Sequence, residues 1–102
     1  MEKIWEFNSY DFGTIKSNQR YIIKFKCLQP IKVINLESAC KCSSPSFNST
    51  TNELYITYIP YSVPIHLKEK GSYTSTKEIM IDYKFNNGKY RDIIKLTSTV
   101  HD

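Results

Sequence analysis

Two alternating runs of residues, separated by Asn86-Asn87-Gly88, constrain this chain more than any other feature. In the first run, residues 73–83, Ile79, Ile81 and Tyr83 fall on one face of an extended strand. In the second, residues 90–100, the side chains at every second position are again mostly apolar. Asn and Gly tolerate the positive φ angles that tight hairpins require. The sequence therefore predicts a long β-hairpin over the last third of the chain.

Shorter alternating segments bounded by turn-forming residues fill the rest of the chain. Residues 20–27 place Tyr21, Ile23, Phe25 and Cys27 on one face, which we expect to face the core. The other expected strands are 4–7, 10–15, 31–39, a short edge segment from Phe47, and 53–59. Residues 40–46 are expected to form a turn, and residues 61–72 an irregular stretch with a helical turn near 65–68.

About seven strands with turns every 8 to 12 residues are typical of an immunoglobulin-like β-sandwich. The composition agrees, because β-branched and aromatic residues are abundant while Ala39 is the sole alanine. The Cys–Trp–Cys core of antibody domains is absent, since Trp5 precedes every cysteine. We therefore expect an all-β fold, an immunoglobulin-like β-sandwich of about seven strands, in one domain over residues 1–102.

The charge pattern bears on the partners of the chain. The net charge is +4, and the lysines alternate with apolar residues along the strands, as on a solvated sheet face. Nucleic-acid readers use clustered basic stripes, so no nucleic-acid partner is expected. No segment is long and apolar enough to span a membrane, and the first residues do not resemble a signal peptide. If Met1 is the native start, the chain is made in a cytoplasm; a trimmed signal would instead place it in the cell envelope.

Candidate chemistry is sparse. Cys40-Lys41-Cys42 is the one close cysteine pair, and in an extended segment its side chains point to opposite faces and cannot close a normal disulfide. Small packed thiols are the simplest interpretation; redox and metal roles stay open. His66 and His101 lack the spacing of zinc ligands. With no phosphate loop or nucleophile motif, we expect no cofactor and no enzyme, although a spatial arrangement of His66 with a cysteine and an acid stays open.

Four short sequence motifs follow one another in an order that indicates a family resemblance. They are Tyr10-Asp11-Phe12-Gly13-Thr14-Ile15, the alternating strand at 21–25, Ile31-Lys32-Val33-Ile34, and Ser38-Ala39-Cys40-Lys41-Cys42. Together they resemble a bacterial and phage immunoglobulin-like domain family of unknown function, related to the ASH/Hydin and major-sperm-protein-like domains. The likeness covers nearly the whole chain. It departs where Lys41 replaces the family's Gly, where the turn before the third strand is shortened to residues 27–30, and where 63–71 replaces a Pro-Gly.

The resemblance implies a binding or structural module without catalytic residues. Short stand-alone members resemble structural proteins of tailed bacteriophages, which need no signal and tolerate free thiols. We therefore expect a non-enzymatic virion component, namely a tail or tail-fibre connector, an adaptor or a capsid decoration protein. Its partners would be other virion proteins in a symmetric assembly built in the host cytoplasm. The alternative is a cellular adhesion or scaffold domain that binds a partner by strand addition.

The expected contact residues lie on loops, because rigid scaffolds present function there. They are Tyr61, Ile65, Leu67 and Tyr73, in or beside the long irregular stretch. Four other residues of the shared motifs are expected to be structural: Phe12, Gly13, Cys40 and Cys42.

Overall fold

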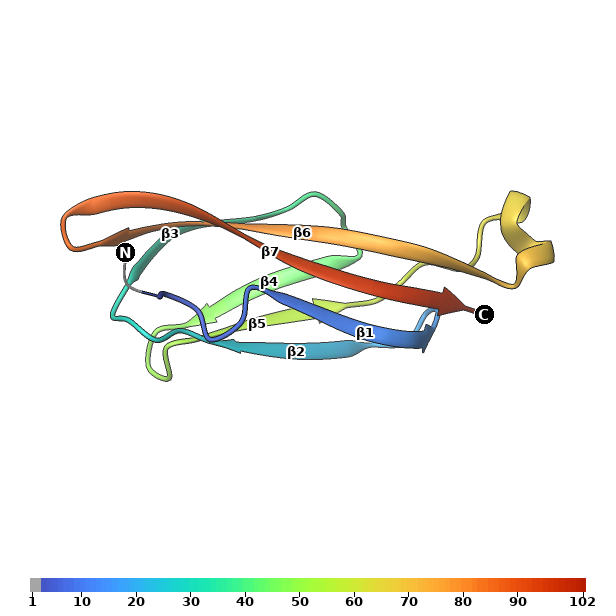
Figure 1. The fold of residues 1–102 in the computed structure, drawn as a ribbon, viewed down its shortest axis with the longest axis horizontal. Helices are drawn as coiled ribbons and strands as arrows, with labels where there is room; N and C mark the ends of the chain where they lie inside the picture. Colours follow the sequence, from blue (N-terminus) through green and yellow to red (C-terminus); the bar gives the residue numbers. More distant parts are fainter. Residues whose placement is uncertain (1–2) are drawn as a thin grey trace.

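The computed structural model describes residues 3–102, which form seven β-strands and one short 3₁₀ helix (Figure 1). The strands are β1 Ser9–Lys16, β2 Tyr21–Lys26, β3 Lys32–Ser38, β4 Ser43–Asn48, β5 Glu53–Tyr58, β6 Ser72–Phe85 and β7 Gly88–His101. The helix, η1, spans Ile65–Lys70 between β5 and β6. The prediction of an all-β chain with about seven strands is confirmed.

The strands form two sheets that pack face to face (Figure 1). One has the order β1-β7-β6-β3 and the other β2-β5-β4. Neighbouring strands are antiparallel except β1 and β7, which are parallel. The central strands of both sheets thus follow the order of an immunoglobulin-like sandwich, with the first strand joined to the sheet that contains the hairpin.

The β6–β7 hairpin is the longest element of the fold. Its two strands of 14 residues pair without interruption from Ser72 opposite His101 to Phe85 opposite Gly88, whereas the strands of the facing sheet have 6 residues each. Asn86 and Asn87, with φ of 48° and 66°, occupy the two central turn positions. Both turn residues are therefore asparagines, as a type I′ turn allows, and Gly88 begins β7. The hairpin sets the long dimension of a molecule measuring 52 × 21 × 20 Å.

The core lies between the sheets and takes alternate residues from each strand. The fully buried side chains of the smaller sheet and of the hairpin are Leu54, Ile56, Tyr58, Ile79, Ile81, Tyr83, Ile94, Leu96 and Val100. Phe25 and Cys27 of the predicted inward face are buried, Tyr21 and Ile23 are half-buried, and Ile22, Lys24 and Lys26 are exposed. The period-2 pattern thus predicted the core face correctly.

The N-terminal segment differs from the expected strand at residues 4–7. Trp5 forms only an isolated bridge with Cys27. The segment then crosses between the sheets: Leu28 N donates to Ile4 O on the β2 side, and Lys95 N of β7 donates to Asn8 O. A segment that leaves one sheet for the other makes too few successive pairs to be a strand.

The expected turn at residues 40–46 is also shorter than predicted. The turn ends before Ser43, where β4 begins, and Pro45 lies inside that strand. Proline lacks the N–H that a ladder needs, so it is confined to edge strands. Among residues 3–102, β4 pairs with β5 alone, so its other side is an open edge that tolerates Pro45.

Phe12 and Gly13 shape β1. The register between β1 and β7 shifts between Asp11 and Thr14, and Gly13 sits in this bulge with a φ of 71°. Its N–H donates to Asp11 Oδ1 at 2.8 Å. The neighbouring Phe12 ring packs against Tyr21 and Tyr58 of the facing sheet. The left-handed backbone explains the glycine, because side-chain-bearing residues rarely adopt it.

One carboxylate connects the N-terminal segment to the tip half of the hairpin. Asp92 Oδ2 accepts hydrogen bonds from Trp5 Nε1 at 2.9 Å and from the Tyr83 hydroxyl at 2.8 Å. Burial of Tyr83, together with the adjacent Asp92 carboxylate, raises the pKa of the phenol above its usual range. Both donors belong to buried side chains, so the carboxylate supplies the acceptor that buried donors require.

We expect Asp92→Leu to lower the free energy of unfolding by about 2–4 kcal/mol, because it leaves two buried donors without an acceptor. Asp82→Asn is the matched control, since Asp82 forms an ion pair with Arg91 on the exposed face of the same hairpin. That variant should change stability little, as exposed pairs contribute little. Urea unfolding measures both; equal losses would contradict the role given to Asp92.

Candidate functional site

The segment between β5 and β6 forms one end of the molecule, where η1 projects beyond the sheets (Figure 1). Pro60 ends β5 and is buried, and its carbonyl accepts a hydrogen bond from Asn18 N at 2.8 Å. Val63 is also buried. These apolar contacts hold the first half of the loop against the sandwich, so the second half is presented from a fixed base.

The helix η1 is defined by its two ends. Leu67 N donates to Pro64 O at 2.9 Å, and Gly71 N donates to Lys68 O at 3.1 Å. Gly71 has a φ of 75°, the left-handed conformation that ends helices and favours glycine. The predicted helical turn at 65–68 is thus present as a 3₁₀ helix over Ile65–Lys70.

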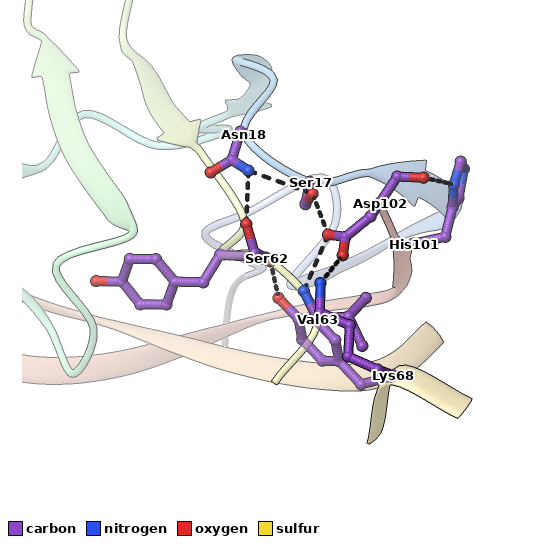
Figure 2. Close-up of polar contacts among 9 residues, drawn as sticks. Ser17, Asn18, Ser62, Val63, Lys68, His101 and Asp102 are labelled. Atoms are coloured by element: carbon purple, nitrogen blue, oxygen red, sulfur yellow. Dashed lines mark hydrogen bonds and ion pairs between the residues drawn. The ribbon is translucent and has the colours of Figure 1, made fainter. Parts of the chain in front are cut away.

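Asp102 ties this loop to the rest of the molecule (Figure 2). Its carboxylate accepts hydrogen bonds from Ser17 Oγ at 2.7 Å and from Val63 N at 3.0 Å, and it forms an ion pair with Lys68. Beside it, Asn18 Nδ2 donates to the hydroxyl of the loop residue Ser62 at 2.8 Å. One side chain therefore joins the β1–β2 turn, the loop, η1 and the end of β7.

The electrostatics of this junction favour the ionised carboxylate. The Lys68 ammonium, the Val63 N–H and the Ser17 hydroxyl hold the pKa of Asp102 well below its usual range. Each of these groups donates to the charged form, which is the physical cause of the shift. The carboxylate is partly exposed, so water also screens its pair with Lys68.

The four expected contact residues fall into two pairs. Tyr61 is 56% exposed and Ile65 is 90% exposed, so both face solvent. Leu67 is half-buried. Tyr73 packs beside the buried cluster of Ile15, Cys42, Tyr58 and Val100. Its hydroxyl donates to Tyr61 O at 2.6 Å, and burial raises the pKa of the phenol. Tyr73 therefore supports the loop, while Tyr61 and Ile65 form its open surface.

The β3–β4 turn meets the base of this loop, because Ile59 N donates to Cys42 O at 2.8 Å. Cys40 and Cys42 form a disulfide here. The expectation of two packed thiols is therefore wrong, because pairing was excluded only for an extended segment and residues 39–42 form a turn. A ring of three residues removes only about 1.6 kcal/mol of unfolded-chain entropy, against about 3 kcal/mol for a loop of 15. The cross-link thus contributes about half of what a disulfide closing a loop of 15 residues would contribute.

The opposite end carries an open hollow of about 740 Å³ beside the N-terminal segment. Its lining includes Trp5, Phe7, Arg91 and Ile93. In the part of the chain that the structure describes, no three His, Cys, Asp or Glu side chains gather as metal ligands. Residues 3–102 also contain no helix whose length and apolar character would let it cross a membrane.

Comparison with known proteins adds no relative from which a role could be taken. No protein-family model matches this sequence, and no curated protein matches it.

Two of the four expected contact residues, Tyr61 and Ile65, are exposed on this loop, but the sequence did not indicate which residues fix the loop. Asp102, Ser17 and Lys68 are far apart in sequence, and their hydrogen bonds follow no periodic pattern. The one available signal was Pro60 and Pro64 flanking the buried Val63, which marks a loop segment that packs inward. The Cys40–Cys42 spacing indicated a pair but not its turn geometry.

Replacing Asp102 with Asn should loosen this end of the molecule in a pH-dependent way. The folded pKa lies below the usual value of about 3.9, so the carboxylate stabilises the fold fully above that pH. The stabilisation is lost as pH falls through the folded pKa. D102N should therefore be less stable than wild type at neutral pH, with a gap that narrows below about pH 4.

Urea unfolding over a pH series measures this gap, and hydrogen exchange of the Val63 amide reports the local loosening. Lys68→Met is the companion variant, because it leaves the carboxylate and its two other donors in place. A stability gap that stays constant from neutral to acid pH would contradict the assignment.

Proposed function

We propose that this chain is a non-enzymatic binding module whose contact surface is the loop of residues 61–71. The observation that carries the proposal is Ile65, an apolar side chain left 90% exposed on a loop that is fixed at its base. In the free chain this side chain is in contact with water. Burying it against a partner would contribute favourable hydrophobic free energy to binding. Because Asp102 and Pro60 already order the loop base, binding costs less conformational entropy.

The partner class follows from the resemblance of the sequence to phage and bacterial immunoglobulin-like domains. We propose that the chain is a structural component of a bacteriophage virion: a tail or tail-fibre connector, an adaptor or a capsid decoration protein. Its partners are then other virion proteins in a symmetric assembly formed in the host cytoplasm. An elongated sandwich of 52 Å with a projecting, ordered loop supports such a bridging role.

A second candidate, peptide binding by strand addition, is favoured by an open edge. β3 pairs with β6 only between Ile79 and Lys84. Within the described residues, the stretch of β6 from Ser72 to Glu78 therefore has a strand partner on one side only, namely β7. An unpaired edge offers backbone N–H and C=O groups to an extended peptide. In this alternative the chain acts as an adhesion or scaffold domain.

Purified virions from cells that produce the chain provide the test of the first proposal. The chain should be present at fixed stoichiometry, and Ile65→Asp should reduce its incorporation at least about tenfold, since a charge would be buried at the contact. Ile22→Asp is the matched control, because Ile22 is an isoleucine of 62% exposure on β2, away from the loop. Absence of the chain from particles, or equal effects of both variants, would refute the proposal.

The strand-addition alternative makes a different prediction for the same complex. A peptide paired with β6 should protect backbone amides within residues 72–78 from hydrogen exchange, because it supplies them with acceptors. Binding through Ile65 should leave those amides as they are in the free chain. The pattern of protection therefore separates the two surfaces.

A further inference from the structure

The Cys40–Cys42 turn is held in shape by groups other than its disulfide. Ser38 Oγ donates to Cys40 O at 2.8 Å and accepts from Cys40 N at 3.3 Å. The same hydroxyl lies 2.6 Å from Ser43 Oγ, and Ser43 N donates to Cys40 O at 3.2 Å. A bracket of two serines thus closes the turn, and it does not require the sulfur–sulfur bond.

The cross-link itself spans one intervening residue. The stabilisation that a disulfide provides by constraining the unfolded chain grows with the length of the loop it closes. A three-residue ring is at the small end of that range, and the serine bracket already fixes the turn. Structural stapling is therefore a weak explanation for two cysteines at this spacing, whereas reversible opening of the bond would leave the fold in place.

The two sulfur-bearing residues occupy unequal positions. Cys42 is 5% exposed and belongs to a buried cluster with Tyr58 and Val100, whereas Cys40 is half-buried and packs against that cluster from outside. The Cys42 N–H points at Cys40 Sγ at 3.2 Å. Lys41, between them, is exposed and forms no ion pair among residues 3–102. An N–H donor and a neighbouring cation are features that stabilise a thiolate, here on the less buried of the two cysteines.

We infer that Cys40-Lys41-Cys42 is a thiol–disulfide exchange site, with Cys40 as the attacking thiol and Cys42 as the resolving thiol. Its substrate class is an accessible disulfide of a peptide or of a small thiol. This site is independent of the proposed binding role, since it uses neither Tyr61 nor Ile65.

The reaction balances in two steps. The Cys40 thiolate attacks one sulfur of an external disulfide, forming a mixed disulfide and releasing the other sulfur as a thiolate. The Cys42 thiol loses its proton to solvent and attacks Cys40 Sγ, which closes the intramolecular bond and releases the second external thiolate. The chain is oxidised by two electrons and the external disulfide is reduced to two thiols; the reverse sequence regenerates the dithiol.

Cys27 is an internal reference for an inert thiol. It is buried at the opposite end of β2 from the β1–β2 turn, and its Sγ donates to Gln29 O at 3.2 Å. Burial raises the pKa of the Cys27 thiol above its usual value. A thiol of this kind is expected to react slowly, so the same molecule contains both a test group and a control.

The inference is tested with glutathione disulfide as the probe. The reduced full chain is mixed with it, quenched with acid at intervals, digested with trypsin without reductant and analysed by mass spectrometry. Cleavage after Lys41 separates the two cysteines, so the intramolecular disulfide leaves peptides 33–41 and 42–68 linked. We expect this linked pair to form, preceded by a glutathione adduct on Cys40, while Cys27 stays unmodified.

Two variants separate the roles of the sulfurs. Cys42→Ser removes the resolving thiol and should accumulate a stable glutathione adduct on Cys40. Cys40→Ser is the matched control and should be modified at Cys42 at least about tenfold more slowly. Equal rates, faster modification of Cys42, or a wild-type chain that keeps both thiols reduced would overturn the inference. If a variant does not fold, the order of adducts on the wild-type chain decides the same question.

Discussion

The length of the β6–β7 hairpin is the constraint on which the rest of the structure depends. Its strands are more than twice as long as those of the facing sheet, so the smaller sheet covers only part of the hairpin's inner face. Buried side chains nevertheless continue toward both ends, to Tyr83 on one side and Val100 on the other. At each end of the hairpin, an irregular segment must therefore shield the buried side chains from water. The hydrophobic free energy gained by burying them offsets the conformational entropy that the segment loses.

Two irregular segments pack at these ends: the N-terminal segment with Trp5 and the loop with Val63. Each is held by hydrogen bonds to one carboxylate. At the tip half of the hairpin, Trp5 lies in the main core cluster and donates to Asp92. At the other end, the buried Val63 belongs to the loop before η1 and donates to Asp102. Asp92 belongs to β7 and Asp102 directly follows it. The hairpin strand β7 therefore supplies or directly precedes the acceptor that fixes each segment. In the second segment, the residues after Val63 form η1, which projects from the sandwich and contains Ile65.

The predictability of the fold follows the range of the interactions. Alternation along β2, β5 and the hairpin is a local pattern imposed by one buried face, so the strands and the inward residues were evident from sequence. The crossing of residues 3–8 between sheets was not, because a segment shared by two partners has no period of its own. The same holds for the junction around Asp102, whose partners lie 34 to 85 positions away. The Cys40–Cys42 disulfide was missed for a local reason: pairing is ruled out only in an extended segment, whereas these residues lie in the turn expected at 40–46.

The two proposed sites lie on a common base, and this shapes how they can interact. Cys42 O accepts from Ile59 N, one residue before the buried Pro60 that starts the loop. When the disulfide opens, the hydrogen bonds of Ser38 and Ser43 still hold the turn. The backbone at Cys42 is therefore expected to keep its position. Because the serine bracket holds the turn, the conformation of the binding loop is expected to be the same whether the disulfide is closed or reduced.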